Sequence, residues 1–214
     1  MTEEDKILQC GCPVAVVPYP VKEIDSKDLD FELETKFNFL SVSLLGHRKN
    51  IDNMINWFID EFKNDDVGLL VKTGGSSGSV MDREYTKNIL KQIVSKQSDR
   101  KCKIYLLHGD LSESEVHSLY KRSDIHGYIT TTHGEGYGLP LFEAAYSGLP
   151  IVATNWSGHL DFLTINTMQE KNKKMFAAVD YNLNEIPKKA VWKDILVEGS
   201  ELSLIHISEP TRPI

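Results

Sequence analysis

The stretch HGYITTTHGEGYGLPLFEAAYSGLPIVAT, residues 126–154, contains the pattern that decides the fold. A short apolar run at His126–Thr130 leads into a glycine-rich turn, a helical stretch at Leu139–Ser147 and a second apolar run at Pro150–Thr154. Pro140 fits the first turn of a helix, because proline lacks a backbone N–H that would be unpaired there. Two apolar runs joined through a helix predict a parallel strand–helix–strand unit.

The same alternation extends from this unit toward the N-terminus. Further short apolar runs predict strands at Pro13–Val17, Phe37–Ser43, Val67–Lys72 and Lys103–Leu107. Between them, helical periodicity or capping residues predict helices at Asn50–Phe62, Asp82–Ser98 and Ser112–Arg122. This alternation predicts an α/β fold with a doubly wound, Rossmann-like parallel sheet. Such sheets bind ligands at the carboxyl ends of their strands, so we expect function in the loops that follow the strands.

The pattern also divides the chain into segments. We expect residues 1–35 to form a connection with a leading strand, and residues 36–163 to form the Rossmann-like domain. Periodicity weakens after Leu163, so residues 164–201 are predicted to be an incomplete C-terminal segment. The run LSLIHISEPTR that follows matches the in-frame translation of a common transposase sequencing adapter. Residues 202–214 are therefore expected to be a non-native tail with few contacts to the core.

Composition excludes several classes of protein. The 214 residues are 41% hydrophobic and carry a net charge of −7, without a block of Lys or Arg, which argues against nucleic-acid binding and a polybasic membrane anchor. No apolar run approaches the roughly 20 residues that span a bilayer, and the charged N-terminus is not a secretory signal. Three cysteines do not form a disulfide framework. We expect a cytoplasmic protein without a transmembrane segment.

The glycine-rich turn is the strongest candidate for a binding site. Three glycines follow the strand within five residues, namely Gly134, Gly136 and Gly138. They allow a ligand to approach the backbone, and the helix N-terminus that follows suits phosphate. Glu135 and Glu143 flank the turn, eight residues apart. In one interpretation Glu135 is a solvated loop acid and Glu143 complements the helix dipole. In another, the two form a glycosidase-type acid/base pair. A metal site is a further alternative, although His133 alone does not complete one.

Three motifs in the expected order resemble one enzyme family. GEGYGLPLFEAAYSGLPIVATNWSGHLDFL strongly resembles the donor-binding half of retaining glycosyltransferases of the GT-B fold, specifically glycosyltransferase family 4 (group 1). FLSVSLLGHRKNIDNMINWFIDEF resembles the first strand and helix of that domain, and LLHGDLSESEVHSLYKRSD resembles the segment that lines its nucleobase pocket. The resemblance runs from about Val16 to Leu163. It implies transfer of a hexosyl group, with retention, from a nucleotide-sugar to an acceptor hydroxyl.

The resemblance also assigns roles to residues. Glu135 and Glu143 match the family's E-x(7)-E motif, in which Glu135 is the catalytic residue facing the transferred sugar and Glu143 accepts hydrogen bonds from the ribose. Arg48 and Lys49 match an R-K-G segment in which the lysine contacts the diphosphate, with Asn50 in place of the glycine. Backbone N–H groups are expected to hold phosphate or sugar at Gly136, Tyr137, Gly138 and Leu139.

The charge of the leaving group is expected to be stabilised without a metal or another cofactor. A lysine and a helix N-terminus can stabilise a departing nucleoside diphosphate. The D-x-D triplet Asp28–Asp30 precedes the domain's first strand and fits a solvated linker. Many relatives carry a second phosphate-binding arginine where this chain has Ser43 or Leu44. Arg48 is a candidate replacement, but neighbouring helix residues point about 100° apart from one another.

The expected partner is the nucleotide-sugar. An N-terminal acceptor domain, which GT-B enzymes place before the donor half, is expected to be missing, so the isolated fragment should not turn over. A non-catalytic nucleotide-sugar-binding module and a GT-B epimerase-like enzyme remain alternatives. His108 and His133 follow strands at the ligand edge and are candidates for ligand contact or for a structural role. The turn Asn155–Gly158 either closes on the sugar or caps the next helix.

Overall fold

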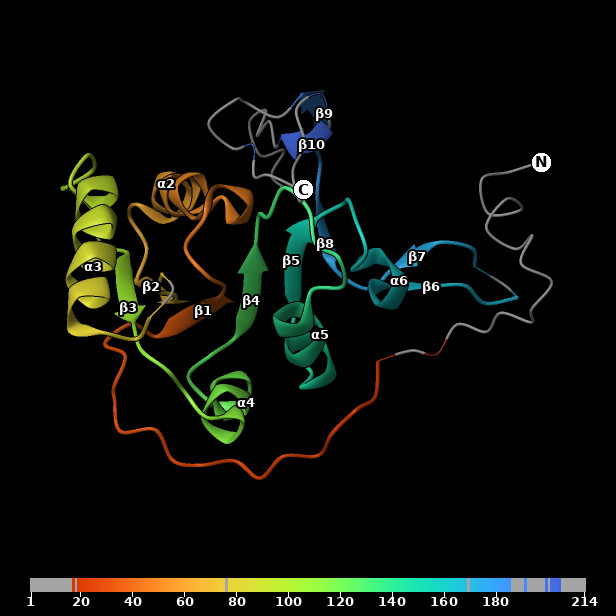
Figure 1. The fold of residues 1–214 in the computed structure, drawn as a ribbon, viewed down its shortest axis with the longest axis horizontal. Coiled ribbons are helices and arrows are strands. Elements are labelled where there is room, and N and C mark those ends of the chain that lie inside the picture. The colour runs from red at the N-terminus through yellow and green to blue at the C-terminus, as the bar shows by residue number, and fades with distance from the viewer. Residues whose placement is uncertain are drawn as a thin grey trace.

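A six-stranded sheet forms the centre of the computed structural model (Figure 1). The structure describes residues 17, 19–75, 77–168, 170–185, 191, 199 and 201–204. All neighbouring strands of the sheet are parallel, in the order β3-β2-β1-β4-β5-β8. The strands are β1 Phe37–Val42, β2 Val67–Lys72, β3 Lys103–Leu107, β4 Gly127–Thr130, β5 Ile151–Thr154 and β8 Ala177–Val179. The predicted Rossmann-like α/β fold is confirmed.

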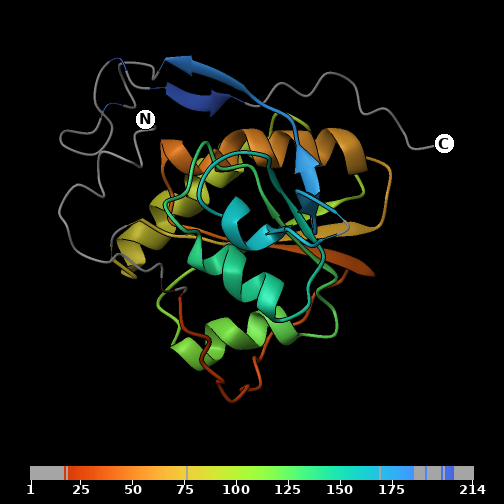
Figure 2. The same ribbon diagram turned by 90° about the vertical axis from the view of Figure 1, so that its right-hand side faces the viewer.

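Helices cover both faces of this sheet (Figures 1 and 2). The helices are the 3-10 turn η2 His47–Lys49, α2 Ile51–Phe62, α3 Val80–Val94, α4 Glu113–Lys121, α5 Leu139–Tyr146 and α6 Leu160–Leu163. The apolar side chains of α2 and α3 pack on one face of the sheet, and those of α4 and α5 pack on the other. Among the described residues, no helix combines the length and apolar composition that crossing a bilayer requires.

The helices begin where their sequences predict. Ser112 and Glu115 form a capping box at the start of α4, in which each side chain bonds the other residue's backbone N–H. Gly138 precedes α5 with a φ of 86°, a left-handed conformation that favours glycine. The four predicted helices and the five predicted strands from Phe37 to Thr154 are confirmed to within a few residues. Most of the strand expected at Pro13–Val17 lies outside the described residues, and Val17 itself is not in a strand.

The segment 19–34 has no regular secondary structure and runs along α4 (Figure 1). Arg122, at the end of α4, donates hydrogen bonds to the backbone oxygens of Leu29 and Phe31 at 3.1 and 3.0 Å. Its guanidinium also lies 4.1 Å from the centre of the Phe31 ring, and it pairs with Asp124 at 2.7 Å. These contacts hold the expected connecting segment against the α4 side of the domain.

Regular structure continues beyond Leu163, where we placed the end of the Rossmann-like domain. Ala177–Val179 forms β8, the sixth strand of the sheet, and Thr164–Ile165 (β6) pairs with Lys173–Lys174 (β7). Strand β8 is short, lies at the sheet edge and is largely exposed, so its sequence lacks the apolar run typical of a buried strand. The division of the chain into domains remains a prediction.

The expectation that the predicted tail makes few contacts is wrong for its first residues. Strand β10, Glu201–Leu204, pairs with β9, Asn182–Glu185, and Leu202 and Ser203 are buried. The Ser203 hydroxyl donates to the His133 backbone oxygen at 2.8 Å. This pairing joins residues far apart in the chain, so no local sequence pattern predicts it. Residues 205–214 lie outside the described part of the structure.

Candidate functional site

The candidate site lies where the strand order of the sheet reverses. Strand β1 has β2 on one side and β4 on the other, so the loops after β1 and β4 leave the sheet next to each other. The His133 N–H donates to the Arg48 backbone oxygen at 2.8 Å, and the Thr132 hydroxyl donates to the same oxygen at 3.2 Å. Open parallel sheets bind ligands at such a switch point. The fold therefore brings together the R-K segment and the glycine-rich turn.

Three charged side chains meet at this point. The Glu135 carboxylate accepts a hydrogen bond from Lys49 Nζ at 2.5 Å and another from Arg48 Nη1 at 3.0 Å. The side chain of Glu135 is 12% exposed, that of Lys49 18% and that of Arg48 37%. We expected Arg48 and Lys49 to point apart, and that expectation is wrong. Both residues belong to the 3-10 turn η2 rather than to α2, and their long side chains converge on one carboxylate.

The charge balance of this cluster favours anions. Burial raises the pKa of the Glu135 carboxyl, but the hydrogen bonds and charges of Lys49 and Arg48 outweigh that effect and leave the pKa below its usual value. Glu135 is therefore ionised at neutral pH and neutralises only one of the two cations. The remaining positive charge lies next to the turn that precedes α5.

The turn itself offers backbone donors. Among the described residues, the N–H groups of Gly136, Tyr137, Gly138 and Leu139 donate no hydrogen bond to the protein. No atom lies within 4 Å of the position that a Cβ would take at Gly136, so the backbone there is open to a ligand. Unpaired N–H groups at the N-terminus of α5 attract negative charge, as the resemblance predicts for this segment.

The turn after β5 supports the backbone of Glu135. The Ser157 hydroxyl accepts from the Glu135 N–H at 2.8 Å, and the Gly158 N–H donates to the Glu135 backbone oxygen at 3.1 Å. A Cβ at Gly158 would lie 1.8 Å from the Gly136 backbone oxygen, so only glycine fits there. The turn Asn155–Gly158 thus positions the Glu135 loop, a role that we did not predict. The Ser157–Gly158 pair in the short loop after β5 was the available sequence signal.

Glu143 faces a different space from Glu135. It lines a cavity of about 280 Å³ between α4, α5 and the connecting segment. Burial raises the pKa of its carboxyl, and the nearby Glu113 charge adds to that effect. The buried Tyr120 hydroxyl lies near enough to affect this pKa, although it has no hydrogen-bond partner among the described residues. The two glutamates of the motif therefore occupy separate environments.

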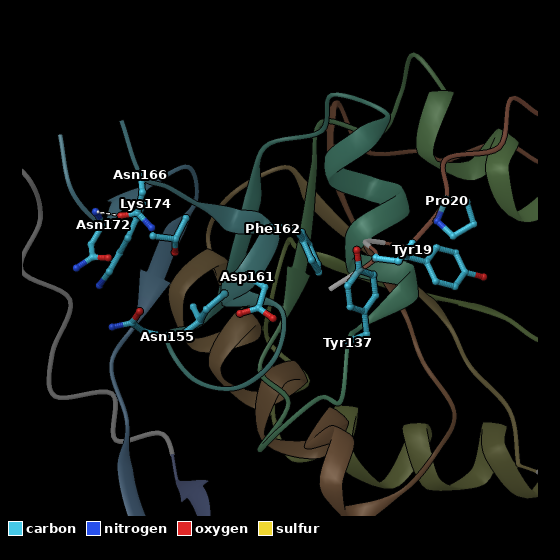
Figure 3. A pocket seen from close by; sticks show the side chains of 12 residues that line it. Tyr19, Pro20, Tyr137, Asn155, Asp161, Phe162, Asn166, Asn172 and Lys174 are labelled. Atoms are coloured by element: carbon cyan, nitrogen blue, oxygen red, sulfur yellow. Dashed lines mark hydrogen bonds between the residues drawn. The ribbon is translucent and has the colours of Figure 1, made fainter. Parts of the chain in front are cut away.

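A larger cavity, of about 1110 Å³, opens on the other side of Tyr137 (Figure 3). Tyr137 and Phe162 form one wall, with ring centres 5.1 Å apart, and Tyr19 lies beside them. Asn166, Asn172 and Lys174 form the opposite wall, with Asn155 on the same side, and Asp161 lies between the two walls. Much of this lining comes from α6 and the β6–β7 hairpin, where we predicted no site.

The two candidate histidines both have protein partners. His108 Nε2 lies 3.0 Å from an Asp82 oxygen, and Asp82 also accepts from the Gly75 N–H, so this pair orders the glycine-rich loop after β2. His133 is buried, and its Nδ1 lies 2.5 Å from the Ser203 backbone oxygen. Within the described ranges, no cluster of three or more His, Cys, Asp or Glu side chains is arranged to hold a metal ion.

The chain that carries these features resembles known proteins. The family model described as glycosyl transferases group 1 matches residues 22–178. The GtfA subunit of UDP-N-acetylglucosamine–peptide N-acetylglucosaminyltransferase from Streptococcus pneumoniae is 28% identical over 138 residues, which are 64% of this chain and 24% of that protein. Alpha-monoglucosyldiacylglycerol synthase from the same species is 25% identical over 187 residues, which are 86% of this chain and 38% of that protein.

The chain is also similar to a solved structure. The pneumococcal O-GlcNAc transferase GtfA in complex with UDP and GlcNAc is 22% identical, with a TM-score of 0.46, covering 78% of this chain and 31% of that chain. The chain therefore spans less than half the length of these relatives.

Proposed function

The chain belongs to the glycosyl transferases group 1 family, and on that premise we propose that it binds a nucleotide-sugar as the donor half of a GT-B enzyme. The reaction is transfer of a hexosyl group to an acceptor hydroxyl with retention, as in glycosyltransferase family 4. The observation that carries the proposal is the cluster of Arg48, Lys49 and Glu135 at the switch point, next to the N-terminus of α5.

The diphosphate of the donor binds next to the two cations of this cluster, Arg48 and Lys49. As the glycosidic bond breaks, negative charge develops on the departing diphosphate, and groups fixed in advance stabilise that charge without reorganising. Lys49 and Arg48 supply the cations, and the four N–H groups from Gly136 to Leu139, which have no partner among the described residues, supply further donors. Arg48 occupies the role of the second phosphate-binding arginine. This arrangement requires neither a divalent cation nor another cofactor.

The two glutamates bind different parts of the donor. Glu135 is ionised and fixed by its partners and by the Ser157–Gly158 turn, so its carboxylate accepts hydrogen bonds from the hydroxyls of the transferred sugar. Glu143 lines the cavity between α4 and α5, where it accepts hydrogen bonds from the ribose. The cavity then holds the nucleobase. Hydrogen bonds to a charged acceptor are about twice as strong as those between neutral groups.

We propose that the acceptor binds to a separate domain, since this chain spans only 24% and 38% of the two relatives. The name of one relative gives a UDP-sugar donor and a peptide acceptor, and the name of the other gives a glucosylated diacylglycerol product. We propose a nucleotide-sugar donor and a cytoplasmic location for this protein as well. An N-terminal domain supplied by a longer protein would complete the active site.

The test is a calorimetric titration of the chain with UDP-, GDP- and ADP-sugars. We expect at least one to bind, with an affinity that EDTA does not change. Lys49→Ala should weaken a nucleoside diphosphate about tenfold while leaving the free nucleoside unaffected, because a charge-assisted contact to phosphate is worth roughly 1.5–3 kcal/mol.

Lys91→Ala is the matched control, since Lys91 lies in the last turn of α3, away from this cluster. Failure of all three donors to bind would refute the proposal. Release of nucleoside diphosphate only when an acceptor and the N-terminal domain are present would distinguish a transferase from a non-catalytic module and from an epimerase.

A further inference from the structure

The cavity of about 1110 Å³ beside Tyr137 is separate from the proposed donor site. Among the described residues, its lining includes none of Arg48, Lys49 and Glu135. Tyr137 belongs to both places, since its N–H lies in the turn before α5 whereas its ring forms part of a cavity wall (Figure 3). Pockets for small molecules measure roughly 300–1,000 Å³, so this cavity is large enough for a ligand of several rings.

One wall of the cavity is a surface of aromatic rings. The ring centre of Tyr137 lies 5.1 Å from that of Phe162 and 5.7 Å from that of Tyr19. These rings come from the turn before α5, from α6 and from the connecting segment. Tyr19 is 49% exposed. Exposed apolar surface that gathers in a concave place is typical of a binding site, because a ligand with an apolar face would remove it from water.

The opposite wall is polar. Asn155, Asn166, Asn172 and Lys174 lie on that side, and Asp161 lies between the two walls (Figure 3). Each asparagine amide carries both N–H donors and a carbonyl acceptor. The Asn172 backbone N–H donates to Asn166 Oδ1 at 2.8 Å, a bond that holds the Asn166 side chain without using its NH₂ group. The wall therefore presents donors and acceptors together.

An aromatic wall that faces amide groups fits a sugar. The faces of a sugar ring carry C–H groups that pack on aromatic rings, and its edge carries hydroxyls that both donate and accept hydrogen bonds. Lys174 and Asp161 have opposite charges, so the cavity does not select an anion such as a nucleotide. The core of a protein interface is depleted in charged residues, so the polar wall argues against a protein segment as the occupant.

We propose that this cavity binds sugar units of an uncharged glycan, as a carbohydrate site separate from the nucleotide-sugar site. The sugar rings pack on Tyr19, Tyr137 and Phe162, and the side chains of the polar wall bond their hydroxyls. This inference goes beyond the proposed function, because it requires neither Glu135 nor the two cations beside it. It predicts that a glycan and a nucleoside diphosphate bind the chain at the same time.

The experiment titrates the 214-residue chain by calorimetry with trisaccharides of glucose, galactose, mannose and N-acetylglucosamine. Tyr19→Ala removes one ring, Tyr19→Phe retains it, and Lys174→Ala removes a donor from the polar wall. Lys173→Ala is the matched control, because Lys173 is the neighbouring residue of β7, pairs with Glu170 at 2.7 Å and does not line the cavity. Thermal unfolding establishes that each variant remains folded.

We expect at least one trisaccharide to bind. Tyr19→Ala and Lys174→Ala should each weaken it roughly fivefold, since an aromatic contact or a hydrogen bond is lost. Tyr19→Phe and Lys173→Ala should leave the affinity unchanged. A saturating concentration of UDP, GDP or ADP should also leave it unchanged, because the two sites are separate.

Failure of all four trisaccharides to bind would overturn the inference. Binding that Tyr19→Ala and Lys174→Ala both leave unchanged would do the same, as would binding that a nucleoside diphosphate abolishes. Self-association of the chain that Tyr19→Ala removes, measured by sedimentation velocity, would make the cavity an interface between copies and would also overturn the inference. If no nucleotide binds the chain, the proposed function fails, while the trisaccharide titrations still decide this inference.

Discussion

Glu135 and Glu143 lie eight residues apart in one glycine-rich motif, yet the structure gives their carboxylates opposite surroundings. Two cations and a supporting turn surround Glu135, and its pKa is lowered. Glu143 faces a cavity without a cationic partner among the described residues, and its pKa is raised. The first carboxylate is organised before any ligand arrives. The second faces the cavity in which the proposed function places the ribose.

The largest effect should come from disturbing the support of the Glu135 loop. Gly158→Ala places a methyl group 1.8 Å from the Gly136 backbone oxygen, so the backbone of one turn must move. We expect the free energy of unfolding to fall by roughly 3 kcal/mol, the upper end of typical overpacking costs. Urea denaturation measures this change. Donor binding, measured by calorimetry, should also be lost.

Gly46→Ala is the control for this prediction. Nothing lies within 4 Å of a Cβ at Gly46, which belongs to the loop after β1, and its φ of 177° is open to any residue. Its stability should stay within about 0.5 kcal/mol of the unaltered chain. A Gly158→Ala variant that is equally stable would mean that the turn after β5 does not constrain Glu135.

A smaller but specific effect on donor binding is expected when Glu143 is replaced. Glu143→Ala should weaken nucleoside diphosphate binding by about tenfold or more, because charge-assisted hydrogen bonds to the ribose are worth roughly 1.5–3 kcal/mol each. Glu113→Ala, which removes a carboxylate from the same cavity but from an exposed ion pair, should change the affinity little. A dissociation constant that Glu143→Ala leaves unchanged, with the fold intact, would remove Glu143 from the site.

The sequence predicts those parts of the molecule that depend on local pattern. The α2 face from Ile51 to Phe62 and the strand Val67–Lys72 follow from periodicity and burial, and the loops at the strand ends follow from the parallel topology. The exposed edge strand β8 carries no such pattern. The grouping of Arg48 and Lys49 was predicted from their motif. The convergence of their side chains on Glu135 was not predicted, because it depends on the 3-10 turn η2, for which the sequence carries no recognisable signal.

The remaining features of the site depend on contacts between distant residues. Ser157 and Gly158 support Glu135 across 22 positions or more of sequence, and only the packed structure reveals that contact. His117 occupied an ordinary helix position in the sequence, and only the structure shows that it lines the cavity between α4 and α5. Sequence motifs therefore identified the charged groups, while the groups that position them required the fold.

The smallest effect is a difference in pH dependence between the two glutamates. Glu135 has a folded pKa below its unfolded value, so its contribution to stability is fully present above the unfolded pKa and is lost as the pH falls through the folded pKa. The folded pKa of Glu143 lies above its unfolded value, so its effect on stability has the opposite sign. As the pH rises past the unfolded pKa, the unfolded chain ionises first, and the folded state loses stability until Glu143 also ionises.

Replacing each residue with glutamine should therefore change stability at pH 7 in opposite directions. We expect Glu135→Gln to lower the free energy of unfolding by about 1 kcal/mol, since Lys49 and Arg48 lose a charged partner, and Glu143→Gln to raise it by a smaller amount. Glu34→Gln is the control, because the Glu34–Lys103 pair is exposed and should have no measurable effect. Urea denaturation between pH 3 and pH 7 measures all three, and the Glu135→Gln and Glu143→Gln differences should shrink toward the acid end of that range. If Glu135→Gln and Glu143→Gln changed the free energy of unfolding at pH 7 in the same direction, the surroundings of the two glutamates would not differ in the way the structure indicates.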